Sequence, residues 1–138
     1  MVGMTLLQLE PLDRTVPVDY TNSMLTIAEL STFIRSAEKL LDAGERQDVI
    51  RYLAEHPKAG DVMEGTGGVR KLRWSRGSQG KSGGVRVIYY FHNESMPLYL
   101  LTLYAKNERS NLTKAQRNDL SELTALLVRA WQRKRNEH

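Results

Sequence analysis

Three consecutive runs of β-forming residues in the middle of the chain constrain its fold more than any other feature. They are residues 68–75 (GVRKLRWS), 84–91 (GVRVIYYF) and 98–105 (LYLLTLYA), each bounded by turn-forming residues. The links between them, residues 76–83 and 92–97, are too short for the crossover that a parallel pair of strands needs. The three runs are therefore expected to pair as an antiparallel meander.

Amphipathic helices are expected before and after this meander. The apolar residues of segment 33–41 recur at helical spacing, and Gly44 suits the end of that helix. Segment 49–54 repeats the pattern in a second short helix, which must end before Pro57. Residues 113–116 (TKAQ) have the capping-box pattern and open a long amphipathic helix with a basic tail.

The expected architecture is α+β, with a helical hairpin and a C-terminal helix packed on one face of an antiparallel β-sheet. Residues 24–138 would form this single domain, with residues 24–29 (MLTIAE) as an edge strand. Residues 1–23 contain Pro11 and Pro17 and little periodicity. We expect this N-terminal extension to be either a mobile arm or a loosely packed extra strand.

The composition excludes several classes of site. The 138 residues include no cysteine, so disulfides and thiolate metal sites are excluded and a reducing cytosol is the natural environment. The three histidines are far apart in the sequence and form no metal-binding pair. The N-terminus lacks the pattern of a secretion signal, and the most apolar stretch, residues 96–105, is too short to span a bilayer. We expect a soluble cytoplasmic protein without a metal or other cofactor.

Basic residues are concentrated in the second half of the chain. Residues 1–64 contain 11 acidic and 6 basic residues, whereas residues 65–138 contain 5 acidic and 14 basic ones. Within the second half, residues 65–93 contain six basic residues and no acidic residue. A solvated basic surface would be the simplest explanation of a net charge of +4, but the clustering favours a binding face for a polyanion, above all RNA.

Side-chain alternation along the expected strands brings part of this charge onto one face. Lys71 and Arg73 alternate with apolar residues on the first strand, as Arg86 does on the second. If the helices cover the apolar side, these three cations share the open face, where their repulsion calls for a bound anion. Tyr90 and Tyr104 lie near enough to stack on unpaired bases. The alternative is an ordinary solvated face, on which arginine and lysine stems cover apolar surface.

The familiar catalytic motifs are missing. The chain has no nucleophilic cysteine, no HExxH zinc motif, no GxxxxGK[ST] phosphate loop and no GxSxG elbow. RNA cleavage still fits, because the 2′-hydroxyl of the RNA is itself the nucleophile. Arginine can stabilise the charge that develops on the phosphate, and a lysine among other cations can act as acid or base because they lower its pKa.

Four segments resemble the RelE/HigB group of toxins from bacterial type II toxin–antitoxin systems. They are residues 65–75 (GTGGVRKLRWS), 80–84 (GKSGG), 85–91 (VRVIYYF) and 100–112 (LLTLYAKNERSNL). The resemblance covers about residues 24–131, and the order and spacing of the motifs are specific to the HigB-like branch. It implies two helices packed on an antiparallel sheet, a ribosome-dependent endoribonuclease that cuts messenger RNA, and a cognate antitoxin.

The resemblance also assigns roles to individual residues. The group's basic pair on the first meander strand corresponds to Lys71 and Arg73, its strand arginine to Arg86, and its lysine after the last strand to Lys106. These four are expected to be catalytic, together with Tyr104, which the resemblance does not itself assign. The residues expected to contact RNA are Arg70, Arg76, Lys81, Tyr90, Asn107 and Arg109. The link at residues 76–83, with Lys81, is either a mobile clamp on the RNA or only a solvent-exposed turn.

The sequence departs from the group at two positions that concern the general base. RelE toxins have a catalytic tyrosine near the C-terminus, where this chain has Thr113. Some HigB toxins use a histidine and an aspartate near the last strand, where residues 104–107 read YAKN. Tyr104 and Tyr90 are the candidates to take that role.

Two other functions stay open at this point. One is an RNA- or ribosome-binding module that does not cut its ligand, in which the cations contribute only phosphate affinity that falls with salt. The other is a gyrase poison resembling the ParE relatives, which does not need a phosphate site. In each case the partner protein expected is an antitoxin that covers the basic groove or makes the toxin too bulky for its target.

Overall fold

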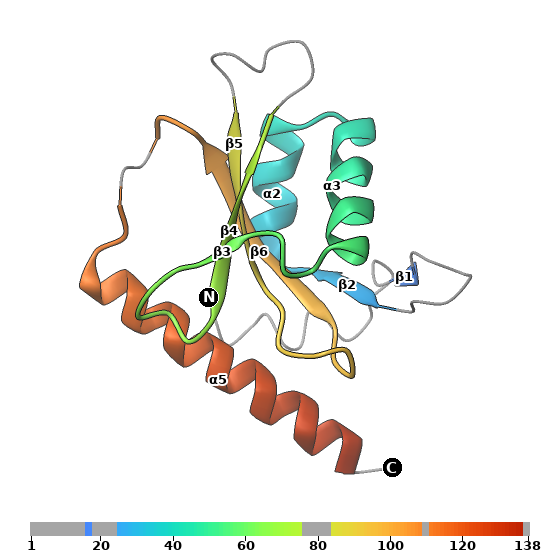
Figure 1. The fold of residues 1–138 in the computed structure, drawn as a ribbon, viewed down its shortest axis with the longest axis vertical. Helices are drawn as coiled ribbons and strands as arrows, with labels where there is room; N and C mark the ends of the chain where they lie inside the picture. Colours follow the sequence, from blue (N-terminus) through green and yellow to red (C-terminus); the bar gives the residue numbers. More distant parts are fainter. Residues whose placement is uncertain (1–15, 18–24, 76–83, 109–110, 137–138) are drawn as a thin grey trace.

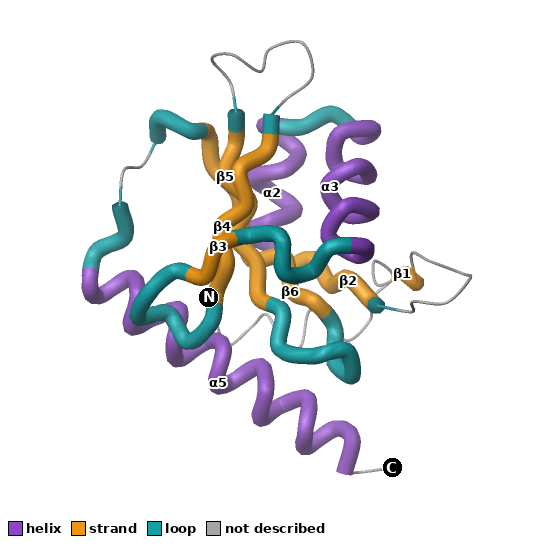
Figure 2. Tube along the Cα trace, in the orientation of Figure 1, coloured by secondary structure: helices purple, strands orange, loops and turns teal. Residues whose placement is uncertain are grey.

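Residues 16–17, 25–75, 84–108 and 111–136 are described in the computed structural model (Figure 1). Among them, six strands form one sheet in the order β1-β2-β6-β5-β4-β3, and helices pack against it (Figure 2). The strands are β1 (Val16–Pro17), β2 (Thr26–Glu29), β3 (Asp61–Val62), β4 (Val69–Trp74), β5 (Val85–Tyr90) and β6 (Leu98–Ala105). The helices are α2 (Ser31–Leu40), α3 (Ala43–Glu55) and α5 (Lys114–Asn136). None of these described helices is long and apolar enough to cross a membrane.

The expected meander and the α+β class are confirmed. β4 pairs antiparallel with β5, and β5 pairs antiparallel with β6, in the order of the sequence. The strand expected at residues 24–29 is β2, but it is not an edge strand. Its outer side pairs antiparallel with β1, which comes from the N-terminal extension, and its inner side pairs parallel with β6. The sheet is therefore mixed, with one parallel pair among its described strands.

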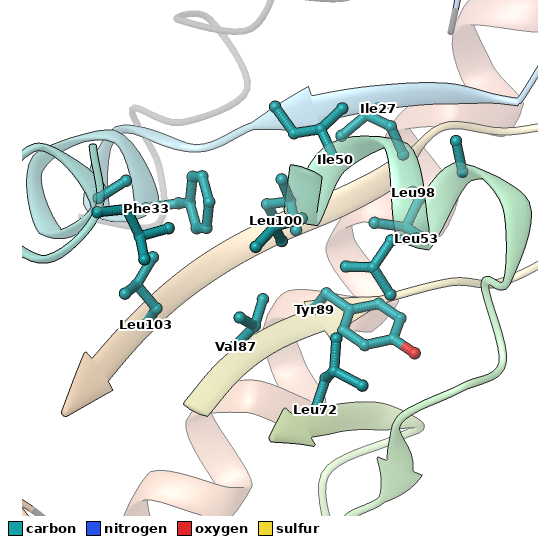
Figure 3. Close-up of a cluster of buried hydrophobic side chains, with 14 of the residues drawn as sticks. Ile27, Phe33, Ile50, Leu53, Leu72, Val87, Tyr89, Leu98, Leu100 and Leu103 are labelled. Atoms are coloured by element: carbon teal, nitrogen blue, oxygen red, sulfur yellow. The ribbon is translucent and has the colours of Figure 1, made fainter. Parts of the chain in front are cut away.

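The helical hairpin of α2 and α3 covers one face of the sheet. Figure 3 shows its core, which includes Ile27, Phe33, Ile50, Leu53, Leu72, Val87, Tyr89, Leu98, Leu100 and Leu103. The expectation that Gly44 ends the first helix is wrong, because Gly44 lies in the first turn of α3. The reason is a capping box: the Asp42 carboxylate accepts from the Glu45 N–H at 2.8 Å, and the Glu45 carboxylate accepts from the Asp42 N–H at 3.0 Å.

Two buried polar contacts fix the hairpin and its following loop on the sheet. The Glu29 carboxylate on β2 accepts from Nε of Arg46 at 3.0 Å and also from Nη2 of the same guanidinium. The Tyr89 phenol donates to the Pro57 carbonyl and accepts from the Gly60 N–H, both at 2.8 Å. Burial raises the pKa of the Tyr89 phenol, so it stays protonated and able to donate. A shift of the hairpin would leave these buried groups unpaired, which makes its position specific.

Helix α5 lies on the opposite face of the sheet from the hairpin (Figure 1), so the expectation that all helices share one face is wrong. The second face has apolar residues of its own, because the central strands are hydrophobic on both sides. Tyr90, Tyr99 and Leu101 form a second core with Leu123 and Leu127 of α5. Apolar surface of this extent must be removed from water, and a second layer of helix achieves that.

The start of α5 is held by its cap and by a close contact with the turn between β3 and β4. The expected capping box is confirmed: Thr113 Oγ1 accepts from the Gln116 N–H at 3.1 Å, and Gln116 Oε1 accepts from the Thr113 N–H at 2.9 Å. Further along, Gly67 lies so near the helix that an added Cβ would be 2.5 Å from Thr124 Oγ1. The Arg117 guanidinium also donates to a carbonyl of this turn. A residue without a side chain at position 67 therefore sets how closely α5 approaches the sheet.

Replacing Gly67 by alanine is expected to destabilise the protein more than the matched change Gly65→Ala. Both glycines have φ of +79°, so each substitution puts a Cβ into the left-handed region. At Gly65 the nearest side-chain atom is Cδ of Arg117 at 3.5 Å, an ordinary contact, whereas at Gly67 the new Cβ collides with Thr124. We expect the free energy of unfolding to fall by about 1–2 kcal/mol for Gly65→Ala and about 2–4 kcal/mol for Gly67→Ala, measured by urea denaturation. Equal losses would show that the approach of α5 does not depend on Gly67.

Candidate nucleic-acid interface

The register of β4, β5 and β6 arranges the predicted cations across one face of the sheet. Arg73 lies directly opposite Arg86, and Arg86 lies directly opposite Tyr104. One pleat along the strands, Lys71 lies opposite Ile88. Side chains of directly opposite residues start within about 5 Å of each other. Lys71, Arg73 and Arg86 therefore form one basic cluster, as the alternation predicted.

The basic cluster has no acidic partner among the described residues. The ion pairs found there involve β2 and the helical hairpin, on the other side of the sheet. Arg73 is exposed, and Lys71 and Arg86 are half-buried. Nη1 of Arg86 lies 3.4 Å from the Val85 carbonyl oxygen, so the guanidinium is held over the start of β5. Cations gathered in this way repel one another, and a bound anion would relieve that repulsion.

The turn after β6 brings a fourth cation to the same end of the sheet. The Lys106 N–H donates to the Gly84 carbonyl at 2.9 Å, which extends the pairing of β5 with β6 and places Lys106 two residues along the strands from the pair of Arg86 and Tyr104. Lys106 and Asn107 are exposed. The Glu108 carboxylate accepts from the N–H of the last residue of β6 at 3.0 Å and so holds the turn. Three predicted RNA contacts lie outside the described residues: Arg76, Lys81 and Arg109.

The two tyrosines expected to stack on bases are both buried, and their positions differ. Tyr90 is 6% exposed beneath α5, and its hydroxyl lies 3.2 Å from Nδ1 of His92. Burial raises the pKa of the Tyr90 phenol, so it is protonated at neutral pH and unsuited to act as a base. The expectation that Tyr90 stacks on a base does not fit this burial. Tyr104 is 7% exposed but lines a pocket and lies opposite Arg86, so it is the tyrosine placed beside the cations.

Arg70 lies on the opposite face of β4 from the basic cluster. Its Nη1 donates to the Gly60 carbonyl at 2.7 Å and to the Lys58 carbonyl at 3.2 Å. These bonds hold the loop between α3 and β3 against the sheet. The structure therefore separates Arg70 from the other predicted RNA contacts and gives it a structural role.

A pocket of about 180 Å³ opens between the sheet and the first half of α5. It is lined by Met63, Ile88, Thr102, Tyr104, Leu112, Gln116, Asp119 and Leu120. Sequence reasoning assigned Gln116 to the capping box and Asp119 to the solvated outer side of the helix, and neither to the site. Their spacing to Leu120 places all three on one side of the helix, but only the packing of α5 on the second face turns that side toward the cations. Among the described residues, no group of histidines and acids could hold a metal ion.

A protein-family model matches most of the chain. Its description is the RelE toxin of the RelE / RelB toxin-antitoxin system, and it matches residues 29–137. The matched part begins at the end of β2 and includes the helical hairpin, the meander with its basic cluster, and α5.

The basic cluster is expected to contact nucleic acid through phosphates. Binding of a single-stranded oligodeoxynucleotide should weaken with salt, and the slope of log K against log salt should fall by about 0.7 for each of Lys71→Ala, Arg73→Ala and Arg86→Ala. Lys39→Ala is the matched control, because Lys39 is exposed on α2 on the other side of the sheet. Fluorescence anisotropy at several salt concentrations gives the slopes. Slopes that do not change in the three variants would contradict a phosphate contact.

Proposed function

The chain belongs to the RelE family of toxins from toxin–antitoxin systems, and on this premise we propose that it is a ribosome-dependent endoribonuclease that cuts messenger RNA and inhibits translation. As a toxin of such a system it has a cognate antitoxin. The observation that supports the proposal most is the basic cluster, in which three cations share one sheet face without an acidic partner among the described residues.

Cleavage by this route needs no nucleophile from the protein. The 2′-oxygen of the RNA forms a bond to the adjacent phosphorus while the bond from phosphorus to the 5′-oxygen breaks. A base must take the proton of the 2′-hydroxyl, and an acid must give a proton to the leaving 5′-oxygen. Negative charge on the non-bridging oxygens grows in the transition state, so cations fixed beside them accelerate the reaction.

The residues of the basic cluster suit these roles. Arg73 and Arg86 lie opposite each other on neighbouring strands and would bind the non-bridging oxygens with their guanidinium groups. Lys71 and Lys106 flank them and would carry protons. Tyr104, opposite Arg86, would be the third group able to exchange a proton with the RNA.

The cap of α5 explains why Thr113 does not serve in place of the tyrosine that RelE toxins carry near the C-terminus. Its hydroxyl accepts from the Gln116 N–H at 3.1 Å, so it holds the first turn of the helix. A threonine hydroxyl is also a far weaker acid than a phenol. We propose that the proton transfer falls to Tyr104 and the lysines instead.

Dependence on the ribosome is part of the proposal, because the RNA must be aligned as well as bound. Three cations at one end of a sheet face can hold a phosphate, but a flexible RNA strand must also be aligned for in-line attack. Alignment contributes a large part of the rate in reactions of this kind, and the ribosome would supply it by holding the message. We also place the chain in the HigB-like branch, on the order and spacing of its basic and glycine motifs.

Arg86→Ala is expected to lower the rate of mRNA cleavage by about 10²–10³-fold, the usual loss when one group that stabilises transition-state charge is removed. Lys71→Ala is expected to lower it by about 10²–10⁴-fold, because it removes a group that carries a proton. Arg86→Lys should recover little, because an ammonium does not reproduce the two-pronged contact of guanidinium. The measurement is sequencing of mRNA ends after brief induction, with purified ribosomes present and absent in a parallel assay. Circular dichroism of each variant controls for folding, and Lys39→Ala controls for loss of charge.

Three outcomes would contradict the proposal. Intact messages in growth-arrested cells that express the wild-type chain would exclude an mRNA endoribonuclease. A small, graded loss shared equally by all the cations would indicate an RNA-binding module. A DNA-damage response without cut RNA would indicate a gyrase poison.

A further inference from the structure

We propose that the pocket between the sheet and α5 holds one nucleobase that carries an exocyclic amine, with Asp119 as the residue that selects it. This inference rests on the proposed function, because it takes the ligand of the basic cluster to be RNA. It adds that the base is the part of the nucleotide that enters the pocket, and that Asp119 selects among the bases.

The pocket lies where the base of a bound nucleotide can reach it. Its wall residues Ile88 and Tyr104 are the direct register partners of Lys71 and Arg86. Opposite side chains start within about 5 Å of each other. A phosphate held by the two cations therefore has its own sugar and base beside the pocket.

The lining of the pocket suits a flat ring with a polar edge. Met63, Ile88, Leu112 and Leu120 supply apolar surface. Polar groups come from the remaining wall residues, among which Gln116 and Asp119 are exposed at the mouth. The volume of about 180 Å³ is well below the roughly 300–1,000 Å³ of sites for drug-sized ligands, so the pocket suits a single ring system.

The Asp119 carboxylate supplies the selectivity, because it can only accept hydrogen bonds. Adenine, cytosine and guanine each offer an amino group to such an acceptor. Uracil offers one N–H between two carbonyl oxygens, which repel a carboxylate. No hydrogen bond or ion pair joins Asp119 to another described residue, so its oxygens are available to a ligand. A lysine or arginine of a protein partner would suit the carboxylate but not the neighbouring basic cluster.

Mapping of cleavage sites tests the selectivity. The wild-type chain should show, at one fixed position next to the cut, a preference of about tenfold for amine-bearing bases over uracil. Asp119→Asn should remove that preference while cleavage persists. Glu122→Gln is the matched control, because Glu122 is an exposed acid on the same helix outside the pocket lining and should keep the wild-type profile. A wild-type profile in Asp119→Asn would overturn the pocket proposal and leave the proposed function standing.

Binding of uncleavable ligands tests the pocket even if the wild-type chain cuts no message. Deoxytrinucleotides lack the 2′-hydroxyl, and thymine has the same hydrogen-bonding edge as uracil. With a central adenine, cytosine or guanine they should bind about tenfold more tightly than with a central thymine, and should shift the methyl NMR signals of Ile88, Leu112 and Leu120. Asp119→Asn should abolish the difference. Equal binding of the four ligands, or shifts confined to residues outside the pocket, would overturn the proposal.

Discussion

The alternation of side chains along β5 is the constraint on which the rest of the structure depends. Val87 and Tyr89 pack under the helical hairpin, whereas Ile88 and Tyr90 pack into the core that α5 covers. Only Arg86, near the start of the strand, escapes burial, and it does so at the end of the sheet where the basic cluster forms. A shift of one residue would send the arginine into the core under the hairpin and put an apolar residue in its half-exposed place, so the register that makes the fold also fixes the site.

Helix α5 covers only part of the second face of the sheet, and the part that it leaves uncovered forms a surface with a pocket. Helix α5 packs against the end of β5 and the neighbouring start of β6. Its first half leaves the space lined by Tyr104 and Asp119. Gly67 lets the helix approach the sheet that closely. The repulsion within the basic cluster is a cost in stability of the kind that functional sites commonly retain. An RNA phosphate or an acidic surface of the antitoxin would relieve it.

The sequence by itself determined the main helices and strands, although not the short strand β3, and the arrangement of charge within the meander. Strand runs and short links specify antiparallel pairing of neighbours, and a period of two then puts Lys71, Arg73 and Arg86 on the same face. The capping box at Thr113 is equally local, since its bonds join residues three apart. The resemblance to RelE toxins depends on the same short segments, so it is present in the sequence alone.

Tertiary structure decided what depends on contacts between distant segments. The pattern of α5 shows which side of the helix is apolar, but not which face of the sheet it covers. Tyr90 therefore looked available to a base until α5 was seen to bury it. Arg70 was expected to contact RNA, but its partners are loop carbonyls 10 and 12 residues earlier in the chain. Asp119 gained its place in the pocket with Ile88 and Tyr104 only through helix packing. Side-chain periodicity and helix capping depend on residues close together in the sequence. Burial and pocket formation depend on contacts between segments far apart in the sequence, which no local pattern predicts.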